Sequence, residues 1–173
     1  MKSKIMHSVN DLVSRIADDI IDEHEELSSV ILVGIITRGF PLAQRIANKI
    51  FEKTGEKVPV AKLDITLYRD DLTLKGHAIQ LHETEIIQDI TDETIILVDD
   101  VFFHGRTARA AIEAVLDHGR PKRIELAILI DRGYRELPIS ANYTGITINT
   151  NEKDQIKVLL QETDGEDKII IND

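Results

Sequence analysis

The sequence contains no cysteine among its 173 residues. A disulfide framework, a zinc site with cysteine ligands and a catalytic thiol are therefore excluded. It also lacks a long apolar run, since the longest surrounds Val30 to Ile36 and is interrupted by Gly34. A membrane-spanning helix needs roughly 20 apolar residues. The first residues show no apolar segment that leads to a cleavage site, so we expect no secretory signal and a cytoplasmic protein.

Positive charge is scarce, because 21 Lys and Arg face 31 Asp and Glu, which gives a formal net charge of −10. This balance argues against a broadly basic surface for nucleic acid, although it leaves room for a local basic patch. A hydrophobic fraction of 42% and a charged fraction of 30% are typical of a globular chain. The length suits one domain, and we expect residues 1–173 to form it.

Hydrophobic patterns predict alternating helices and strands. Residues 9–26 carry apolar side chains at helical spacing, with Ser8 and Asn10 available as caps. Residues 29–35 form a nearly continuous β-branched run, the pattern of a strand buried on both faces of a parallel sheet. The further predicted elements are a helix from Pro41 to Lys53, strands 58–68 and 94–100, a helix 107–119, a strand 123–130, and a hairpin of 156–161 with 168–171 across Asp164-Gly165.

This order of elements predicts an α/β fold with a central, mainly parallel sheet. Residues 69–93 are polar and have no clear periodicity. A connection of that length in a compact domain is either a functional loop or a pair of short strands.

The segment with the most chemistry is 95–107, where an apolar strand ends in the adjacent carboxylates Asp99 and Asp100. A short loop with Gly105 follows and leads directly into a helix. The free N–H groups of such a loop and first helical turn, together with the helix dipole, bind phosphate. The carboxylates would repel that phosphate, but they suit the hydroxyls of a ribose. The combination predicts a site for a ribose 5-phosphate.

The alternative is that Asp99 and Asp100 merely end a strand and cap the next turn. The four hydrophobic residues before the pair, and the Gly-Arg-Thr and helix after it, favour a binding site at the carboxyl end of the strand.

The pattern strand-Asp-Asp-Val-x-x-x-Gly-x-Thr-helix resembles the phosphoribosyl diphosphate (PRPP) signature of the type I phosphoribosyltransferases. Four blocks extend this likeness to the PyrR family of pyrimidine operon regulators: residues 34–47, 64–72 (DITLYRDDL), 96–121 and 127–143. That family consists of uracil phosphoribosyltransferases that can also bind RNA as attenuators. The resemblance implies the type I fold, in which a mainly parallel sheet flanked by helices carries a small hood and a mobile loop.

The same resemblance implies the roles of individual residues. Asp99 and Asp100 would hold the ribose hydroxyls. Thr37, Arg38 and Gly39 are similar to the pyrophosphate loop, where a strained or cis peptide before the arginine is typical. The backbone of the phosphate loop would hold the 5-phosphate; this loop comprises Phe103, His104, Gly105, Arg106 and Thr107.

Arg69 matches the start of the family's mobile catalytic loop and, with Lys75, would close over the diphosphate and exclude water. Two simpler alternatives stay open: Arg69 as part of a solvated charge cluster, and Thr37–Gly39 as a plain turn. Asp131 and Arg132 fall in the family's nucleobase region, and Ile156 is assigned to that region by spacing alone.

The implied reaction is an attack of uracil on C1 of PRPP, which releases pyrophosphate and gives UMP. Mg²⁺ would bind mainly through PRPP, because it is a hard cation that prefers oxygen ligands and keeps several waters. The histidines outside the phosphate loop lack the spacing of metal ligands, so no metal site built by the protein alone is expected.

The sequence departs from the family pattern in two places. His104 stands where the family usually has Thr or Ser, and its alternative role is that of an exposed loop residue. Tyr134, Ser140 and Ile146 stand where family members tend to be basic, which weakens the case for an mRNA leader hairpin as partner. Arg15, Thr37 and Arg135 remain as candidate RNA contacts.

Three hypotheses follow. The first is a Mg²⁺-dependent uracil phosphoribosyltransferase that also regulates pyrimidine genes by UMP-dependent mRNA binding. The second is a nucleotide-sensing RNA-binding regulator with weak or no catalysis, and the third is a type I transferase for another nucleobase. Because the family commonly forms dimers or higher oligomers, we expect a homo-oligomer, and the apolar residues of the first helix could serve its interface.

Overall fold

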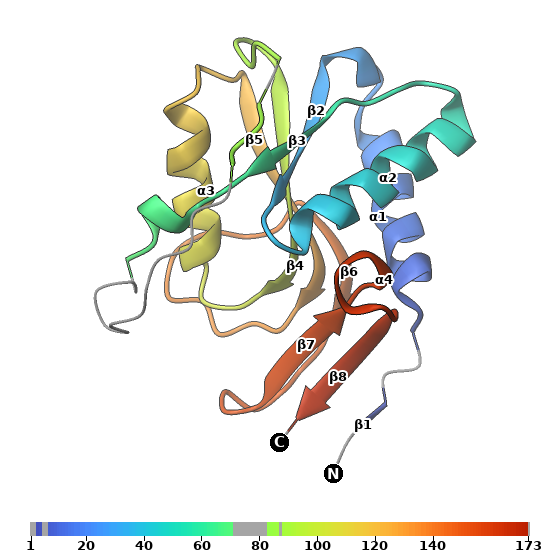
Figure 1. The fold of residues 1–173 in the computed structure, drawn as a ribbon, viewed down its shortest axis with the longest axis vertical. Helices are drawn as coiled ribbons and strands as arrows, with labels where there is room; N and C mark the ends of the chain where they lie inside the picture. The colour runs from blue at the N-terminus through green and yellow to red at the C-terminus, as the bar shows by residue number, and fades with distance from the viewer. Residues whose placement is uncertain (1–2, 5–6, 71–82, 87, 173) are drawn as a thin grey trace.

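The computed structural model describes residues 3–4, 7–70, 83–86 and 88–172. It contains a five-stranded parallel sheet with helices on both faces, and a three-stranded antiparallel sheet at one end (Figure 1). The strands of the larger sheet are, in spatial order, β3 (Val60–Leu63), β2 (Val30–Ile35), β4 (Thr94–Phe102), β5 (Arg123–Asp131) and β6 (Tyr143–Thr147). The predicted α/β architecture with a mainly parallel sheet is thereby confirmed.

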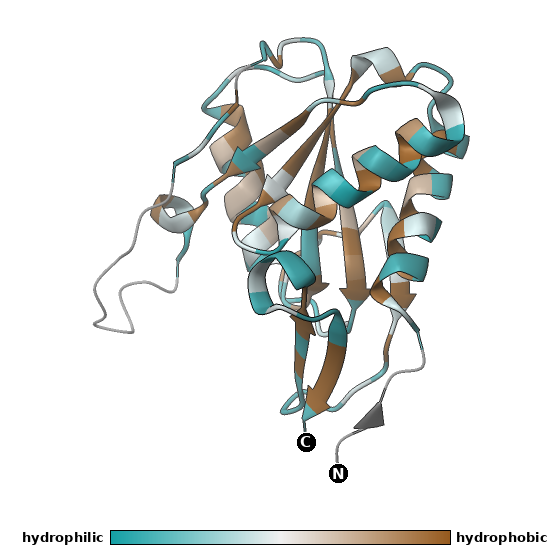
Figure 2. Cartoon of the chain, turned by 45° about the vertical axis from the view of Figure 1, so that its right-hand side comes forward, coloured by the Kyte–Doolittle hydropathy of each residue, from teal (hydrophilic) through white to brown (hydrophobic). Residues whose placement is uncertain are grey.

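Helices α1 (Val9–Glu23) and α2 (Gly39–Thr54) cover one face of this sheet, and α3 (Arg106–Leu116) covers the other (Figure 1). Within β2, Leu32 packs into the core under α1 and α2, whereas Val33 packs into the core under α3. Figure 2 shows apolar strands enclosed by helices whose outward faces are polar. The prediction of a strand buried on both faces is confirmed.

The three-stranded sheet and its connecting helix form a hood beyond the carboxyl ends of the parallel strands (Figure 1). The hood comprises β1 (Ser3–Lys4), β7 (Gln155–Leu159), α4 (Gln161–Asp164) and β8 (Lys168–Asn172). The predicted pairing of 156–161 with 168–171 is confirmed, since Ile156 lies opposite Ile171. The predicted tight turn is wrong, because α4 occupies the connection and Gly165, at φ 78°, ends that helical turn.

Helix α1 begins as predicted, with the Ser8 side chain accepting a hydrogen bond from the Asp11 N–H at 3.1 Å. It ends at Glu23, earlier than expected. Its apolar side chains, such as Leu12 and Ile16, are buried against the chain's own sheet. The suggestion that these residues serve an interface between copies is therefore wrong, because the chain already covers them.

Several boundaries differ from the prediction. The strand expected over 58–68 ends at Leu63, because the Asp64 carboxylate accepts hydrogen bonds from the N–H and hydroxyl of Thr66 and starts a turn. One turn of 3₁₀ helix follows at Thr66–Tyr68. Strand β4 runs to Phe102 instead of ending at Asp100, because its pairing with β5 continues to that residue.

Other features were not predicted. Helix α3 ends at Leu116 instead of Gly119, as His118 folds back to bond the carbonyls of Val115 and Ala114. Strands β6 and β1 had no recognised signal, nor did the short 3₁₀ helix at Leu27–Ser29. Of the polar stretch 69–93, Glu85 forms a bridge to Lys62, and Lys75 lies outside the described residues. No helix in the described part of the chain is both long and apolar enough to cross a bilayer.

The close approach of α2 to β2 gives a test of the fold. A Cβ added at Gly34 would lie 2.3 Å from the Cα of Phe40, which is backbone and cannot move aside. We expect Gly34→Ala to lower the free energy of unfolding by about 2 kcal/mol or more. The control is Gly55→Asn, at φ 77° with open space around it, which we expect to change stability by less than about 1 kcal/mol. Equal urea midpoints for the two variants would contradict the prediction.

Candidate active site

Strand β4 extends beyond the end of its neighbour β2. Their pairing ends at Gly34 opposite Val98, and β4 then continues without β2 beside it. The side chains of the next residues bond the freed backbone: Asp99 accepts from the N–H of Asp100 and Asp100 from that of Val101, both at 2.9 Å. The acidic pair therefore lies where the two loops meet.

Two neighbouring cavities open at this place. One, of about 270 Å³, lies over the phosphate loop, and the other, of about 370 Å³, lies over the pyrophosphate loop. The residues that line both are Ile35, Arg69, Asp99, Val101 and Thr107. The predicted residues from three separate segments thus meet: Thr37, Arg38, Arg69, Asp99, Asp100 and the phosphate loop from Phe103 to Thr107.

The phosphate loop has the predicted strand-loop-helix form. Gly105 adopts φ 93° immediately before α3, a conformation that glycine adopts at little cost. The carbonyl of His104 accepts hydrogen bonds from the N–H groups of Glu136 and Leu137, at 3.0 and 3.3 Å. The segment that contains Glu136 and Leu137 therefore holds the phosphate loop through its backbone. The first turn of α3 has N–H groups without intrahelical partners, as every helix does, and it lines the cavity.

Two side chains of the phosphate loop have partners within the protein. The Arg106 guanidinium donates to Glu136 and to Asp70, in each case at 2.7 Å. The His104 ring stacks on Phe103 with centroids 3.6 Å apart, and its Nε2 lies 3.6 Å from Glu136 Oε1. His104 is therefore a packed, half-buried residue and not a freely exposed loop histidine.

The pyrophosphate loop contains a cis peptide between Ile36 and Thr37. A cis or strained peptide before Arg38 was predicted, and the observed cis bond precedes Thr37, the residue before that arginine. Helix α2 begins so close to β4 that a Cβ at Gly39 would lie 2.2 Å from the carbonyl oxygen of Val98. Thr37 and Arg38 line the second cavity, and the Arg38 guanidinium donates to Asp164 in the hood at 2.8 and 3.3 Å.

The acidic pair is electrostatically unbalanced. Burial raises the pKa of Asp99 well above its usual range, and the nearby charge of Asp100 raises it further. The Arg69 guanidinium acts in the opposite direction and lowers that pKa. The site therefore favours a bound group that donates hydrogen bonds or carries positive charge. Asp64 and Thr66, which sequence reasoning did not select, also line the second cavity, the one over the pyrophosphate loop. Both lie in the block 64–72.

Asp131 is the last residue of β5, Arg132 follows it, and hydrogen bonds join both to the segment around the phosphate loop. The carboxylate of Asp131 accepts from the N–H of Gly133 at 2.9 Å and from Arg135 at 2.6 Å. Arg132 is buried, and its guanidinium carbon lies 3.9 Å from the centre of the Phe103 ring. The Nη2 atom of Arg132 donates to the carbonyls of residues 151 and 152 at 3.1 and 3.2 Å.

Ile156 lies on β7, where its side chain packs against the core under α1 and α2. Within the described part of the chain, the residues that line the two cavities do not include Asp131, Arg132 or Ile156. The structure therefore brings Asp131 and Arg132 next to the phosphate loop, while Ile156 belongs to the hood.

The candidate RNA contacts have different surroundings. Arg15 is exposed on α1 and donates to the carbonyl of Gly145 at 3.0 Å. Arg135 donates to the carbonyls of Phe103 and Gly133 and lies 3.4 Å from the centre of the Phe102 ring. Its guanidinium is thus already bound inside the protein. Three residues stand where basic residues are typical of the family. Tyr134 and Ser140 are exposed, and Ile146 is half-buried.

Comparison with known proteins agrees with this geometry. The model of the phosphoribosyl transferase domain family matches residues 4–163. A bifunctional protein PyrR of Chloroflexus aurantiacus is 52% identical over 157 residues, which cover 91% of this chain and 86% of that protein. The chain belongs to the PyrR family. The PyrR proteins of Thermus aquaticus and Desulfosudis oleivorans are 53% and 47% identical, over 90% and 95% of this chain and 86% and 91% of their own.

Solved structures show the same fold at much lower identity. A hypoxanthine-guanine phosphoribosyltransferase of Bacillus anthracis has a TM-score of 0.69 at 17% identity, over 98% of this chain and 96% of its own. A hypoxanthine phosphoribosyl transferase of Trypanosoma cruzi gives a TM-score of 0.71 at 18% identity, over 98% and 90%. This PyrR-family chain is thus a phosphoribosyltransferase with the type I fold, as predicted.

The raised pKa of Asp99 predicts how stability depends on pH. A carboxyl group whose pKa is higher in the folded state stabilises the protein below its unfolded pKa of about 3.9, and this contribution is lost as pH rises. Asp99→Asn, which stays uncharged, should therefore unfold at higher urea concentration than the wild type at pH 7.5. The two midpoints should converge as the pH falls towards 4.

The control is Glu25→Gln, which neutralises an exposed carboxylate after α1. We expect its midpoint to follow the wild type at every pH. A difference between Asp99→Asn and the wild type that is the same at pH 4 and pH 7.5 would contradict the assigned cause.

Proposed function

We propose that this chain transfers the phosphoribosyl group of PRPP to uracil, so that UMP and pyrophosphate are formed. The observation that carries the proposal is the position of Asp99 and Asp100 between two anion-binding loops, with Arg69 and Thr107 lining both cavities. PRPP has the matching order of groups: a 5-phosphate, a diol and a diphosphate. Membership of the PyrR family supports uracil as the acceptor base.

The 5-phosphate would lie on the backbone of Phe103–Thr107 and at the start of α3. Backbone N–H groups and the helix dipole favour an anion there. Arg106 would act mainly by holding the loop, because its guanidinium is engaged by Asp70 and Glu136. His104, stacked on Phe103, would fill the place of the usual hydroxyl residue without closing the cavity.

The ribose hydroxyls would donate hydrogen bonds to Asp99 and Asp100. Such donors relieve the unfavourable desolvation that raises the pKa of Asp99. On the other side, Thr37, Arg38 and Gly39 would receive the diphosphate, and Arg69 would add positive charge where negative charge develops on the leaving group. Lys75, which lies outside the described residues, stays a prediction for the same task.

The donor set fits Mg²⁺ bound through the substrate. The described residues contain no cluster of three or more His, Asp or Glu side chains that could hold a metal by themselves. Asp99 and Asp100 supply oxygen ligands, directly or through water and ribose hydroxyls, which are the ligands Mg²⁺ prefers. When bound, the cation would supply positive charge beside the leaving diphosphate.

The chain's own contribution to the reaction would be positioning and electrostatics. Uracil attacks C1 of the ribose as the C1–oxygen bond to the diphosphate breaks, and no covalent intermediate with the protein is needed. Asp131 and Arg132 would form the edge of the base site, which the stacking of Arg132 on Phe103 joins to the phosphate loop. Ile156 stays a weaker prediction for this site, since it packs in the hood.

The deciding test is pyrophosphate release by purified protein with PRPP and Mg²⁺, comparing uracil, hypoxanthine, guanine and orotate. We expect turnover with uracil. Asp100→Asn should lower kcat/KM by about 100-fold or more, because it removes a charge that the substrate hydroxyls and cation require. Asp19→Asn, at an exposed position on α1, is the matched control and should match the wild type.

Turnover with another base only would overturn uracil as the acceptor and leave the reaction class intact. No turnover with any base, in a protein that still binds UMP, would favour a nucleotide-sensing regulator without catalysis.

A second function, UMP-dependent binding of an mRNA leader hairpin, is favoured by membership of the PyrR family, whose relatives are named bifunctional. Arg15 is the candidate contact with an exposed side chain on α1. Thr37 is exposed too, but it also lines the second cavity. Arg135 is the weakest, because its guanidinium is already bound within the protein.

An electrophoretic shift of a leader hairpin at low salt tests this role. We expect UMP to strengthen binding of the hairpin. Arg15→Gln should weaken that binding about threefold to tenfold, and this loss of affinity should be smaller at high salt. Arg109→Gln, on α3 at the opposite face of the sheet, is the matched control. Absence of a UMP-dependent shift would remove the RNA role, and equal losses for the two variants would remove Arg15 from the contact surface.

Three further expectations rest on sequence and family alone. We propose that residues 1–173 act as one domain, that the protein is cytoplasmic, and that it forms a homo-oligomer through surfaces other than the buried face of α1.

A further inference from the structure

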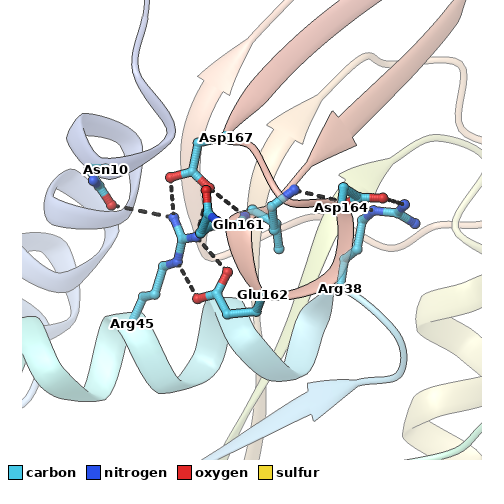
Figure 3. A network of polar contacts seen from close by, with 8 residues as sticks. Asn10, Arg38, Arg45, Gln161, Glu162, Asp164 and Asp167 are labelled. Atoms are coloured by element: carbon cyan, nitrogen blue, oxygen red, sulfur yellow. Dashed lines mark hydrogen bonds and ion pairs between the residues drawn. The ribbon is translucent and has the colours of Figure 1, made fainter.

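Helix α2 binds the hood through two arginines on one face. Arg38, immediately before the helix, and Arg45, within it, are seven residues apart, which is close to two helical turns. Both point to the segment 161–167 that connects β7 with β8 (Figure 3). Three carboxylates of that segment accept their hydrogen bonds, so the contact between α2 and the hood is made of opposite charges.

Arg45 fixes the connecting segment to α2. Its guanidinium donates to both carboxylate oxygens of Glu162, at 2.8 and 2.6 Å, and to both of Asp167, at 2.8 and 2.7 Å. The Asp167 carboxylate also accepts the N–H of Gln161 at 2.8 Å. Arg45 holds the two carboxylates together, and its hydrogen bonds keep the pKa values of both below the usual range.

Asp164 extends this joint to the pyrophosphate loop. Its Oδ1 accepts from Arg38 Nη2 at 2.8 Å, and its Oδ2 accepts from Arg38 Nε at 3.3 Å and from the Leu160 N–H at 2.9 Å. The side chains of Arg38 and Asp164 are only 26% and 17% exposed. The hydrogen bond from the Leu160 N–H anchors this pair to the backbone of the hood.

Resting on the function proposed above, we propose that Asp164 is a positioning residue for PRPP. It holds Arg38, and through it the loop Thr37–Gly39, in the shape that receives the diphosphate. A loop that is already ordered binds its ligand without the entropy loss of ordering it, and one immobilised side chain changes affinity by about threefold to tenfold. The ion pair therefore makes the hood, which is distant in sequence, part of the diphosphate site.

The test is Asp164→Asn in the full-length chain, with steady-state kinetics in each substrate. We expect KM for PRPP to rise about threefold to tenfold, while KM for uracil and kcat at saturating PRPP stay within about twofold of the wild type. Glu166→Gln neutralises an exposed carboxylate of the same connection and is the matched control. It should leave all three values unchanged.

A double-mutant cycle shows whether Asp164 acts through Arg38. In an Arg38→Gln background, Asp164→Asn should add no further increase in KM for PRPP, because the partner is already gone. If Asp164→Asn does not fold, Arg45→Met gives the second variant: it frees the segment that carries Asp164 and should raise KM for PRPP in the same direction.

Several results would overturn the proposal. An unchanged or lower KM for PRPP in Asp164→Asn would do so, and so would an equal increase with and without Arg38. A wild type without uracil turnover would instead contradict the proposed function, and calorimetric binding of PRPP with Mg²⁺ to wild type and Asp164→Asn would then decide the positioning role by itself.

Discussion

The parallel pairing of β2 with β4 is the interaction on which the site depends. It ends at Gly34 opposite Val98, so the loop after β2 begins beside the part of β4 that carries Asp99 and Asp100. The start of α2 packs closely on the backbone of β4, since a Cβ at Gly39 would collide with the Val98 carbonyl. Backbone packing alone thus places the pyrophosphate loop beside the acidic pair. The polar side chains of Thr37, Arg38 and the acidic pair then line the cavity between them.

Within that opening, the arginines of the two anion-binding loops share a role. Arg38 is held by Asp164 of the hood, and Arg106 by Asp70 and Glu136. Both guanidinium groups organise their loops, while the start of α3 and Arg69 line the cavities that would receive the ligand. The raised pKa of Asp99 indicates the opposite need on the acidic side, where the proposed ribose hydroxyls and cation would balance the negative charge.

Much of the fold could be predicted because buried strands and amphipathic helices follow local periodicity. Residues 30–35 and 95–98 are apolar on both faces, and the structure buries them on both faces. The prediction for 58–68 failed because one polar contact, from Asp64 to Thr66, ended the strand early. Strand β6 was missed because its apolar residues are few and its Gly145 is required by tertiary contacts, with the carbonyl of Leu129 and the side chain of Leu12.

The sequence by itself determined which chemistry the chain carries: an acidic pair after an apolar strand, a glycine before a helix, and the blocks of the PyrR family. Only the tertiary structure decided which partners those side chains have. The contact between Arg38 and Asp164 joins positions 126 residues apart, and nothing in either local pattern predicts it. Periodicity reports short-range sterics and burial, whereas ion-pair partners depend on how the whole chain closes around its sheets.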